Sequence, residues 1–354
     1  MTDEADAGWQ FVYMRNIDIS RVPKEALASI WDSLGIDCSS VACSSMVGAY
    51  LAEFIVRKDY VAQFVAKLTS IRTPDPLDAS LSVSVDTDYS PIAPHAHIIP
   101  DTCAVPQPAL DALNTYARES LAKRWGSLYH ASAQPGVRQL IRQSLAKHTL
   151  ELQQPSTPLK ASRLGAPLQP FCASDIVRHR APNHAILSKD HLAELIPQPT
   201  ATRLVTYTDG AYLPERGTAG IGAYFANTGI PPLALRLGGH QSVARAEIHA
   251  VHMALEHLAP VLDDHGGWRE IWVCTDSQYV VDAVNVFSET WRKANWLTAK
   301  GKPIANRTAF RLLFAEIQRL SARGYTVFVH HLPAHFGIAG NDIADTLAKA
   351  GALL

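Results

Sequence analysis

The feature that most constrains the fold of this chain is the alternation of strand-like and helix-like segments between residues 203 and 354. Three short apolar segments separated by turn residues come first and indicate an antiparallel meander, at residues 203–210, 219–226 and 233–239. Helical and strand segments then alternate, at residues 242–262, 269–276, 277–287, 306–324, 325–333 and 339–354. This order predicts a mixed α/β sheet that is covered by helices.

Four acidic residues of this region occupy positions where burial is expected. Asp209 ends the first strand and Asp276 ends the strand at 269–276, and α/β sheets bind ligands at such strand ends. Glu247 heads an apolar helical stripe, and Asp345 lies among apolar residues of the last helix. A single acid of this kind is more often a helix cap or a surface residue, and Asp276 could cap the helix that follows it.

Four carboxylates at one end of a sheet would repel one another strongly if all of them were ionised. Divalent cations relieve this repulsion, and hard oxygen ligands suit Mg²⁺, with Mn²⁺ as a substitute. Two such ions can activate water and stabilise both the attacking and the leaving oxygen in phosphodiester hydrolysis. The pattern therefore predicts a site for two metal ions.

A basic segment at residues 291–311 contains no acidic residue. Its cations are Arg292, Lys293, Lys300, Lys302, Arg307 and Arg311. In a chain with a formal net charge of −1, such a segment is a local positive patch suited to phosphate contacts that weaken with salt. Trp291 and Trp296 lie between these charges and could pack against a sugar or a base. The alternative is a solvated pair of helices with two core tryptophans.

Four sequence blocks, YTDGA, ARAEIHAV, CTDSQYVV and LPAHFGIAGNDIAD, occur in this order. They resemble the signature blocks of type 1 ribonuclease H, and the resemblance covers roughly residues 203–354, within a catalytic domain expected at 201–354. The resemblance implies a ribonuclease H-like mixed sheet of five strands and a metal-dependent endonuclease that cuts the RNA strand of RNA–DNA hybrids, leaving 5′-phosphates. It implies that Asp209, Glu247, Asp276 and Asp345 are catalytic metal ligands and that His335 assists proton transfer or product release. Asp342 is a rival for the fourth acid, and the spacing from His335 favours Asp345.

The same resemblance extends to substrate contacts, because the basic segment is similar to the family's channel for the DNA strand. The residues it assigns to substrate binding are Gly210, Ser242, Asn306, Trp291, Trp296, Arg292, Lys293, Lys300 and Lys302. Val243 and Ala244 stand where the family often carries polar residues that read the minor groove and the RNA 2′-hydroxyls. This departure favours two alternatives: a catalytically weak or inactive nucleic-acid-binding protein, or a nuclease of this fold that acts on other substrates.

The order strand, helix, strand, strand, helix at residues 9–71 predicts a small ferredoxin-like α+β unit. RNA-recognition modules share this order and carry stacking aromatics on the third strand, where this chain offers Phe54, with Tyr50 and Tyr60 nearby. A protein-contact domain is the alternative, and its protein partner is unknown. This region also resembles the early part of non-LTR retroelement proteins, which implies a retrotransposon origin. The remaining parts are a Pro-rich linker at 72–106, a helical hairpin at 107–152 and a second linker at 153–200.

Composition argues against several other classes of protein. The five cysteines are scattered and odd in number, which argues against a disulfide framework and favours a reducing compartment. The first ten residues include acids and lack the apolar core of a secretory signal, and no apolar run approaches the ~20 residues of a membrane helix. We therefore expect a cytoplasmic or nuclear protein that acts on an RNA–DNA hybrid and does not enter a membrane.

Overall fold

The computed structural model describes residues 8–17, 19, 22, 24–47, 51–71, 83–153, 196–264, 267–298, 300–334 and 337–354. The chain forms two compact units, one made of Met1–Ile92 with Ala117–Ala193 and the other of Ala93–Tyr116 with Glu194–Leu354. Among the residues that the structure describes, no helix combines the length and the apolar character needed to cross a membrane.

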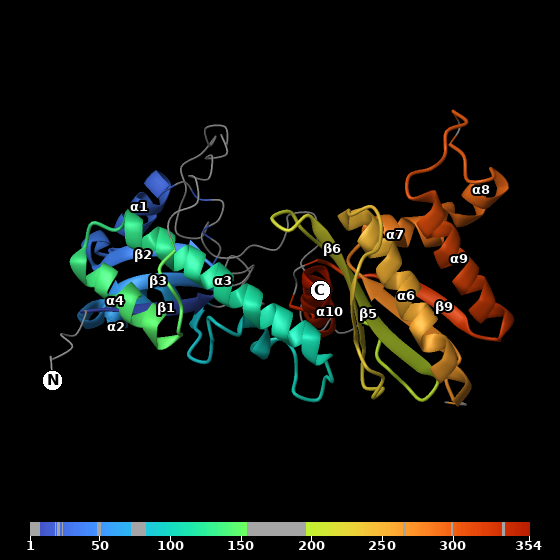
Figure 1. The fold of residues 1–354 in the computed structure, drawn as a ribbon, viewed down its shortest axis with the longest axis horizontal. Helices are drawn as coiled ribbons and strands as arrows, with labels where there is room; N and C mark the ends of the chain where they lie inside the picture. The colour runs from blue at the N-terminus through green and yellow to red at the C-terminus, as the bar shows by residue number, and fades with distance from the viewer. Residues whose placement is uncertain are drawn as a thin grey trace. The chain divides into compact units, whose positions relative to one another are not determined.

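The second unit is built on a sheet with the strand order β7-β6-β5-β8-β9 (Figure 1). Its strands are β5 (Arg203–Leu213), β6 (Thr218–Phe225), β7 (Leu233–Arg236), β8 (Glu270–Thr275) and β9 (Thr326–His331). The pairs β5–β6 and β6–β7 are antiparallel, whereas β5–β8 and β8–β9 are parallel. The predicted mixed sheet of five strands is therefore confirmed.

Helices cover both faces of this sheet. The helices of this unit that follow β7 in the chain are α6 (Val243–Asp264), α7 (Gln278–Asp282), α8 (Ser288–Lys293), α9 (Arg307–Ala322) and α10 (Ala339–Leu353), with a π-helical segment at Ala283–Phe287 between α7 and α8. The alternation of side chains along β6 explains the two layers, because Ile221 packs with the α6 side while Gly222 lies against the backbone of α10. The helix predicted at 277–287 corresponds to α7 and the π-helical segment. It continues into α8, which carries the first residues of the basic segment.

The first unit contains a second, four-stranded antiparallel sheet with the order β2-β3-β1-β4. Its elements are β1 (Trp9–Arg15), α1 (Lys24–Ser33), β2 (Val41–Met46), β3 (Leu51–Arg57), α2 (Val61–Thr69), β4 (Ser84–Val85), the part of α3 (Gln107–Ala131) from Ala117 onward, and α4 (Pro135–Lys147). Two residues of the segment expected to be a linker thus complete the sheet, where Val85 pairs with Met14. The strand order confirms the predicted ferredoxin-like arrangement.

Both faces of this small sheet are covered by helices. Phe54 is fully buried on the side of α1 and α2, where its ring centroid lies 6.0 Å from Trp31 and 5.1 Å from Phe64. On the opposite face, Phe11 of β1 stacks on Trp125 of α3 with centroids 4.7 Å apart and an interplanar angle of 16°. The prediction that Phe54 could stack on an RNA base is therefore wrong, because packing of the helices encloses its ring.

A buried carboxylate ties the helical hairpin to the small sheet. Glu53 of β3 is 1% exposed and accepts hydrogen bonds from Arg124 Nε at 3.1 Å, Trp125 Nε1 at 3.2 Å and Tyr13 Oη at 3.0 Å. Burial and the negative charge of Glu53 raise the pKa of Tyr13, so its hydroxyl remains a donor. Arg124 is thus a structural partner of Glu53, and its charge is not part of a solvated basic face.

Candidate metal-binding active site

The pairing of β5 with β8 brings two of the predicted acids together. These strands are parallel, and Tyr207 and Cys274 form the last pair of their register. Asp209 and Asp276 each follow two residues later, so both carboxylates lie at the same level and on the same face of the sheet. Asp276 follows the end of β8 as predicted, but the prediction that Asp209 ends its strand is wrong, because pairing with β6 continues β5 to Leu213. In the part of the chain that is described, Asp276 makes no hydrogen bond to the N-terminus of α7, which argues against a capping role.

Glu247 reaches the same place from α6, and the close approach of this helix depends on Gly210. A Cβ atom at Gly210 would overlap the backbone nitrogen of Glu247 and the carbonyl carbon of Ala246. Glycine therefore allows the first turns of α6 to lie directly on β5. Glu247 itself is 8% exposed, as the apolar stripe behind it in the sequence predicts.

The three carboxylates form a compact cluster. One oxygen from each of Asp209, Glu247 and Asp276 can be chosen such that all three atoms lie within 4.8 Å of one another. The donor set consists of oxygens alone, which is the kind that Mg²⁺ and Mn²⁺ prefer. In addition, Oε2 of Glu247 is buried and has no hydrogen-bond partner among the described residues. A buried, unpartnered carboxylate oxygen that faces two other acids fits a divalent cation.

Crowding of these acids opposes their ionisation. Burial is the largest cause that raises the pKa of Asp209 to about 8, and the charges of Asp345 and Asp276 add to it. Burial, followed by the charges of Asp209 and Asp276, also raises the pKa of Glu247 well above its usual value. A backbone hydrogen bond with Gly210 opposes both shifts. Without a bound cation, Asp209 and Glu247 therefore keep their protons at pH values at which the same side chains in water would be ionised.

We expect this proton retention to make the stability of the metal-free protein depend on pH. In the unfolded chain Asp209 titrates near ~3.9, whereas its folded pKa is about 8, so the folded state binds more protons between these values. The stabilising contribution is complete below about pH 4 and is lost as the pH rises through about 8. Calorimetric melting in EDTA should show the wild type falling relative to Asp209→Asn across this window. Parallel pH profiles of the two proteins would contradict the expectation.

The fourth predicted acid, Asp345, lies next to this cluster but outside it. Its charge is among the causes that raise the pKa of Asp209, so the two carboxyl groups are neighbours. Its Oδ2 accepts an ion-pair contact from Lys349 Nζ at 2.5 Å. Asp342, the rival for this role, is half-buried in the first turn of α10.

Two residues near the acids were not predicted to take part. Asn341 is buried and donates a hydrogen bond from Nδ2 to Oδ2 of Asp276 at 3.2 Å, while its Oδ1 has no partner among the described residues. Lys349 pairs with Asp345. Asn341, Asp345 and Lys349 recur every four residues and share one face of α10. That spacing is visible in the sequence, but only the structure shows what the two side chains contact. His335 lies outside the described residues.

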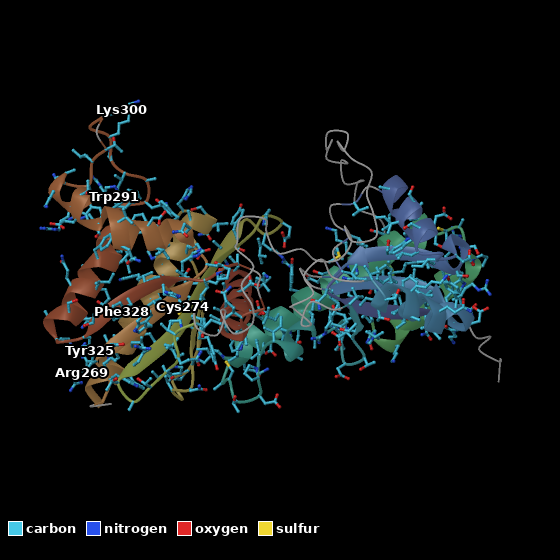
Figure 2. The ribbon with its side chains drawn as sticks, turned by 180° about the vertical axis from the view of Figure 1, so that it is seen from behind. Arg269, Cys274, Trp291, Lys300, Tyr325 and Phe328 are labelled. Atoms are coloured by element: carbon cyan, nitrogen blue, oxygen red, sulfur yellow. The ribbon has the colours of Figure 1, made fainter. Side chains whose placement is uncertain are left out.

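Among the predicted substrate-binding residues, Gly210 adjoins the carboxylates, and the others come from the residue before α6 and from the basic segment. Ser242 precedes α6 and accepts a hydrogen bond from the backbone nitrogen of Arg245, and Asn306 precedes α9 with a left-handed φ of 54°. The helix α8 and the loop that joins it to α9 form a protrusion. Lys300 lies at its tip and Trp291 lies at its base (Figure 2). Lys293 forms an ion pair with Glu289 at 2.8 Å, and Lys302 is exposed. Among the described residues, no hydrogen bond or ion pair joins any of these side chains to the three acids.

The two tryptophans are part of the packing of the protrusion. Both are half-buried, and their ring centroids lie 6.5 Å apart. Trp291 also lies 5.3 Å from Phe310, and Trp296 lies 5.4 Å from Phe314. Packing thus fixes one side of each ring and leaves the other side accessible in part.

Comparison with known proteins agrees with this geometry. The RNase H family model matches residues 201–353. Ribonuclease H of Anaeromyxobacter sp. strain K is 35% identical over 159 residues, which cover 42% of this chain and 80% of the relative. Ribonuclease H1 of Homo sapiens is 32% identical over 152 residues, covering 42% of this chain and 50% of the relative. The solved structure of RNase H1 from Halobacterium salinarum NRC-1 is 24% identical, with a TM-score of 0.30, and the match covers 42% of this chain and 93% of that one.

Two observations define the class of protein: the mixed sheet with its cluster of three acids, and the similarity to these relatives. The chain belongs to the ribonuclease H family through residues 201–353. It spans about half the length of the mammalian relatives that it matches, 50% of the human protein and 55% of the rat protein.

Proposed function

We propose that this protein is a metal-dependent endonuclease that hydrolyses the RNA strand of RNA–DNA hybrids. The observation that carries the proposal is the cluster of Asp209, Glu247 and Asp276, whose oxygens lie within 4.8 Å of one another in a member of the ribonuclease H family. The function is assigned to residues 201–354, and residues 1–200 are given no chemical role in it.

Asp209, Glu247, Asp276 and Asp345 would hold two Mg²⁺ ions, or Mn²⁺ in their place. The raised pKa values of Asp209 and Glu247 support this assignment, because a bound cation is what allows these groups to ionise. When bound, the ions supply an activated water and stabilise charge on the attacking and leaving oxygens, so that the products carry 5′-phosphate and 3′-hydroxyl ends.

The remaining residues of the proposed site position these ligands and the substrate. Asn341 holds one oxygen of Asp276, and Gly210 lets Glu247 approach the strand. Lys349 holds Asp345 away from the three-acid cluster in the structure, and rotation of Asp345 toward the cluster would exchange this ion pair for a cation. His335 would assist proton transfer or product release. The basic segment at 291–311, with Ser242 and Asn306, would contact phosphates of the DNA strand.

Cleavage of a labelled RNA–DNA hybrid tests the proposal. We expect the full chain to cut only the RNA strand, only with Mg²⁺ or Mn²⁺, and to release 5′-phosphorylated products. Asp276→Asn should abolish cleavage because it removes a ligand charge at the cluster while keeping the shape of the side chain. Wild-type protein that is as silent as this variant would reject the proposal.

One observation favours a second candidate function. Val243 is 49% exposed at the start of α6, where polar readers of the hybrid are common in the family, so direct reading of the minor groove is weakened. A catalytically inactive nucleic-acid-binding protein would bind the hybrid without turnover. Parallel assays with hybrid, duplex RNA and duplex DNA would separate this candidate, and a nuclease of other specificity, from the leading proposal.

A further inference from the structure

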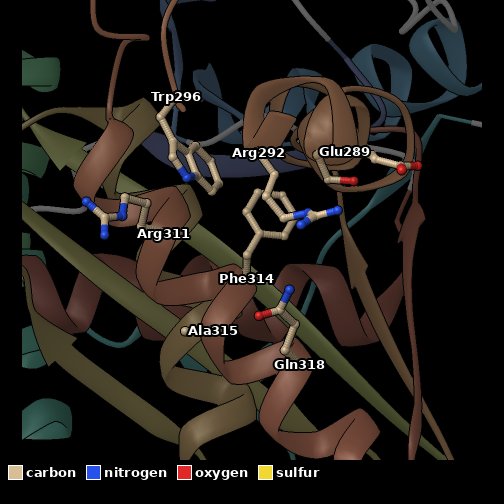
Figure 3. A pocket seen from close by; sticks show the side chains of 8 residues that line it. Glu289, Arg292, Trp296, Arg311, Phe314, Ala315 and Gln318 are labelled. Carbon is tan, nitrogen blue, oxygen red and sulfur yellow. The ribbon is translucent and has the colours of Figure 1, made fainter. Parts of the chain in front are cut away.

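A hollow of about 390 Å³ lies between α8, α9 and the loop that joins them, and it is separate from the carboxylate cluster. Figure 3 shows the side chains around it, with Glu289 and Arg292 reaching it from α8, and Arg311, Phe314 and Gln318 from α9. Trp296 of the connecting loop closes one side.

This hollow uses a different face of α8 from the one that carries Trp291. Ser288 and Arg292 are four residues apart and both line the hollow, so they share one face of the helix. Phe287 and Trp291 share another face, where their rings stack with centroids 5.5 Å apart at an angle of 18°. Arg292 is thus directed away from the aromatic face on which Trp291 lies.

The lining combines positive charge with aromatic surface. Arg292 and Arg311 are exposed, and neither forms an ion pair with another described residue. The carboxylate of Glu289, which also lines the hollow, is paired with Lys293 at 2.8 Å, so its charge is partly offset. The rings of Trp296 and Phe314 lie 5.4 Å apart at an angle of 40° and form a wall beside the arginines.

The backbone fixes Trp296 at this wall. Asn295 and Trp296 have φ angles of 50° and 61°, so two consecutive residues other than glycine adopt the left-handed conformation. Such a conformation is unfavourable for a bulky residue and persists only where the surroundings enforce it. Here the backbone nitrogen of Trp296 donates to the carbonyl oxygen of Trp291 at 2.7 Å, which anchors the loop to the end of α8.

From these features we propose that the hollow binds an unpaired nucleotide of a DNA strand that extends beyond the hybrid. Arg292 and Arg311 lie on opposite sides of the hollow, so one of the two phosphates that flank the nucleotide lies against each guanidinium group, and the base packs on Trp296 and Phe314. Guanidinium groups suit phosphate, and an aromatic wall accepts any base by stacking. The DNA strand is favoured because the adjoining basic segment is assigned to that strand under the proposed function, on which this inference rests.

Equilibrium binding in EDTA, where metal-dependent cleavage is prevented, tests the inference on the full chain. The affinity for a blunt hybrid is compared with that for the same hybrid carrying a short unpaired tail at either end of its DNA strand. We expect a tail to strengthen binding by about fivefold to tenfold, which is the lower end of the range that stacking of one base supplies. An abasic tail, which keeps the phosphates and lacks the rings, should lose most of this gain.

Arg311→Gln should lower the ratio of tailed to blunt affinity, because the variant loses one phosphate partner in the hollow. Arg236→Gln is the matched control, since it removes one exposed arginine from β7 of the same unit and should keep the ratio. Melting temperatures of both variants verify that they remain folded. Equal ratios for Arg311→Gln and wild type would overturn the inference.

A competition experiment distinguishes a DNA strand from a free nucleotide as the ligand of the hollow. If adenosine monophosphate occupies the hollow in an Arg311-dependent manner while a tail adds nothing, the assignment to a DNA strand is overturned. Failure of the nuclease proposal is recognised separately, by absence of cleavage with Mg²⁺, since the gain from a tail is measured without metal.

Discussion

Replacing Glu247 with glutamine is expected to abolish cleavage of the hybrid and, at the same time, to raise the melting temperature of the metal-free protein. Activity is lost because a ligand charge disappears, and several kcal/mol of transition-state stabilisation correspond to ~10³-fold or more in rate. Stability increases because glutamine cannot ionise, so a source of repulsion with Asp209 and Asp276 is removed. The gain should be larger at pH 9 than at pH 6, where the wild-type carboxyl is more fully protonated.

Glu256→Gln provides the matched control for this experiment. Glu256 lies on the same helix, is exposed, and is not a member of the carboxylate cluster. The control should leave both the cleavage rate and the melting temperature close to those of the wild type, within the ±0.5 kcal/mol usual for surface changes. If Glu247→Gln melted at a lower temperature than the wild type in EDTA at pH 9, the idea that the acids destabilise the empty site would be wrong.

Replacing Gly222 with alanine is expected to destabilise the second unit by about 3 kcal/mol or more. A Cβ atom at this position would overlap the carbonyl oxygen of Ala344 and the backbone nitrogen of Ala348, both on α10. Backbone atoms of a packed helix cannot rotate aside as a flexible side chain can, so α10 as a whole would have to shift. Because Asp345 and Asn341 are carried by the same helix, cleavage should fall together with stability.

Gly238→Ala is the control for the glycine substitution. No atom lies within 4 Å of a Cβ built at Gly238, and the residue needs no left-handed backbone. Urea unfolding of the two variants measures the difference directly. Equal unfolding free energies for Gly222→Ala and Gly238→Ala would show that α10 is packed less tightly on β6 than the structure indicates.

The positions of Asp276 and Glu247 could be predicted because the end of β8 and the helical stripe of α6 are visible in the sequence, whereas Asp209 was expected to end its strand and lies inside β5. The apolar run before Asp276 and the stripe behind Glu247 each fix one side chain relative to its own element. Asn341 and Lys349 were missed because polar residues on a helix are usually solvated, and only the position of α10 shows what they contact. The same reason explains why the ion pair that holds Asp345 beside the cluster could not be anticipated.

The first unit shows where reasoning from the sequence stops. The order of its main elements followed from periodicity, but β4 consists of two residues and carries no pattern that could reveal it. The direction of Phe54 depends on which face of the sheet α1 and α2 cover, which a single strand cannot disclose. The role of Arg124 was missed for a similar reason, since its partner Glu53 is distant in sequence.

The parallel register of β5 and β8 has a consequence for how sequences of this kind can diverge. Side chains alternate between the two faces of a strand, so inserting one amino acid within β8 would turn Asp276 toward the layer of α6 and α9. Lengthening the loops that join the elements has no such effect, because the loops do not set the phase of the strand. Insertions and deletions that preserve a working site should therefore be confined to the connections, where gain or loss of chain leaves the acids facing one another.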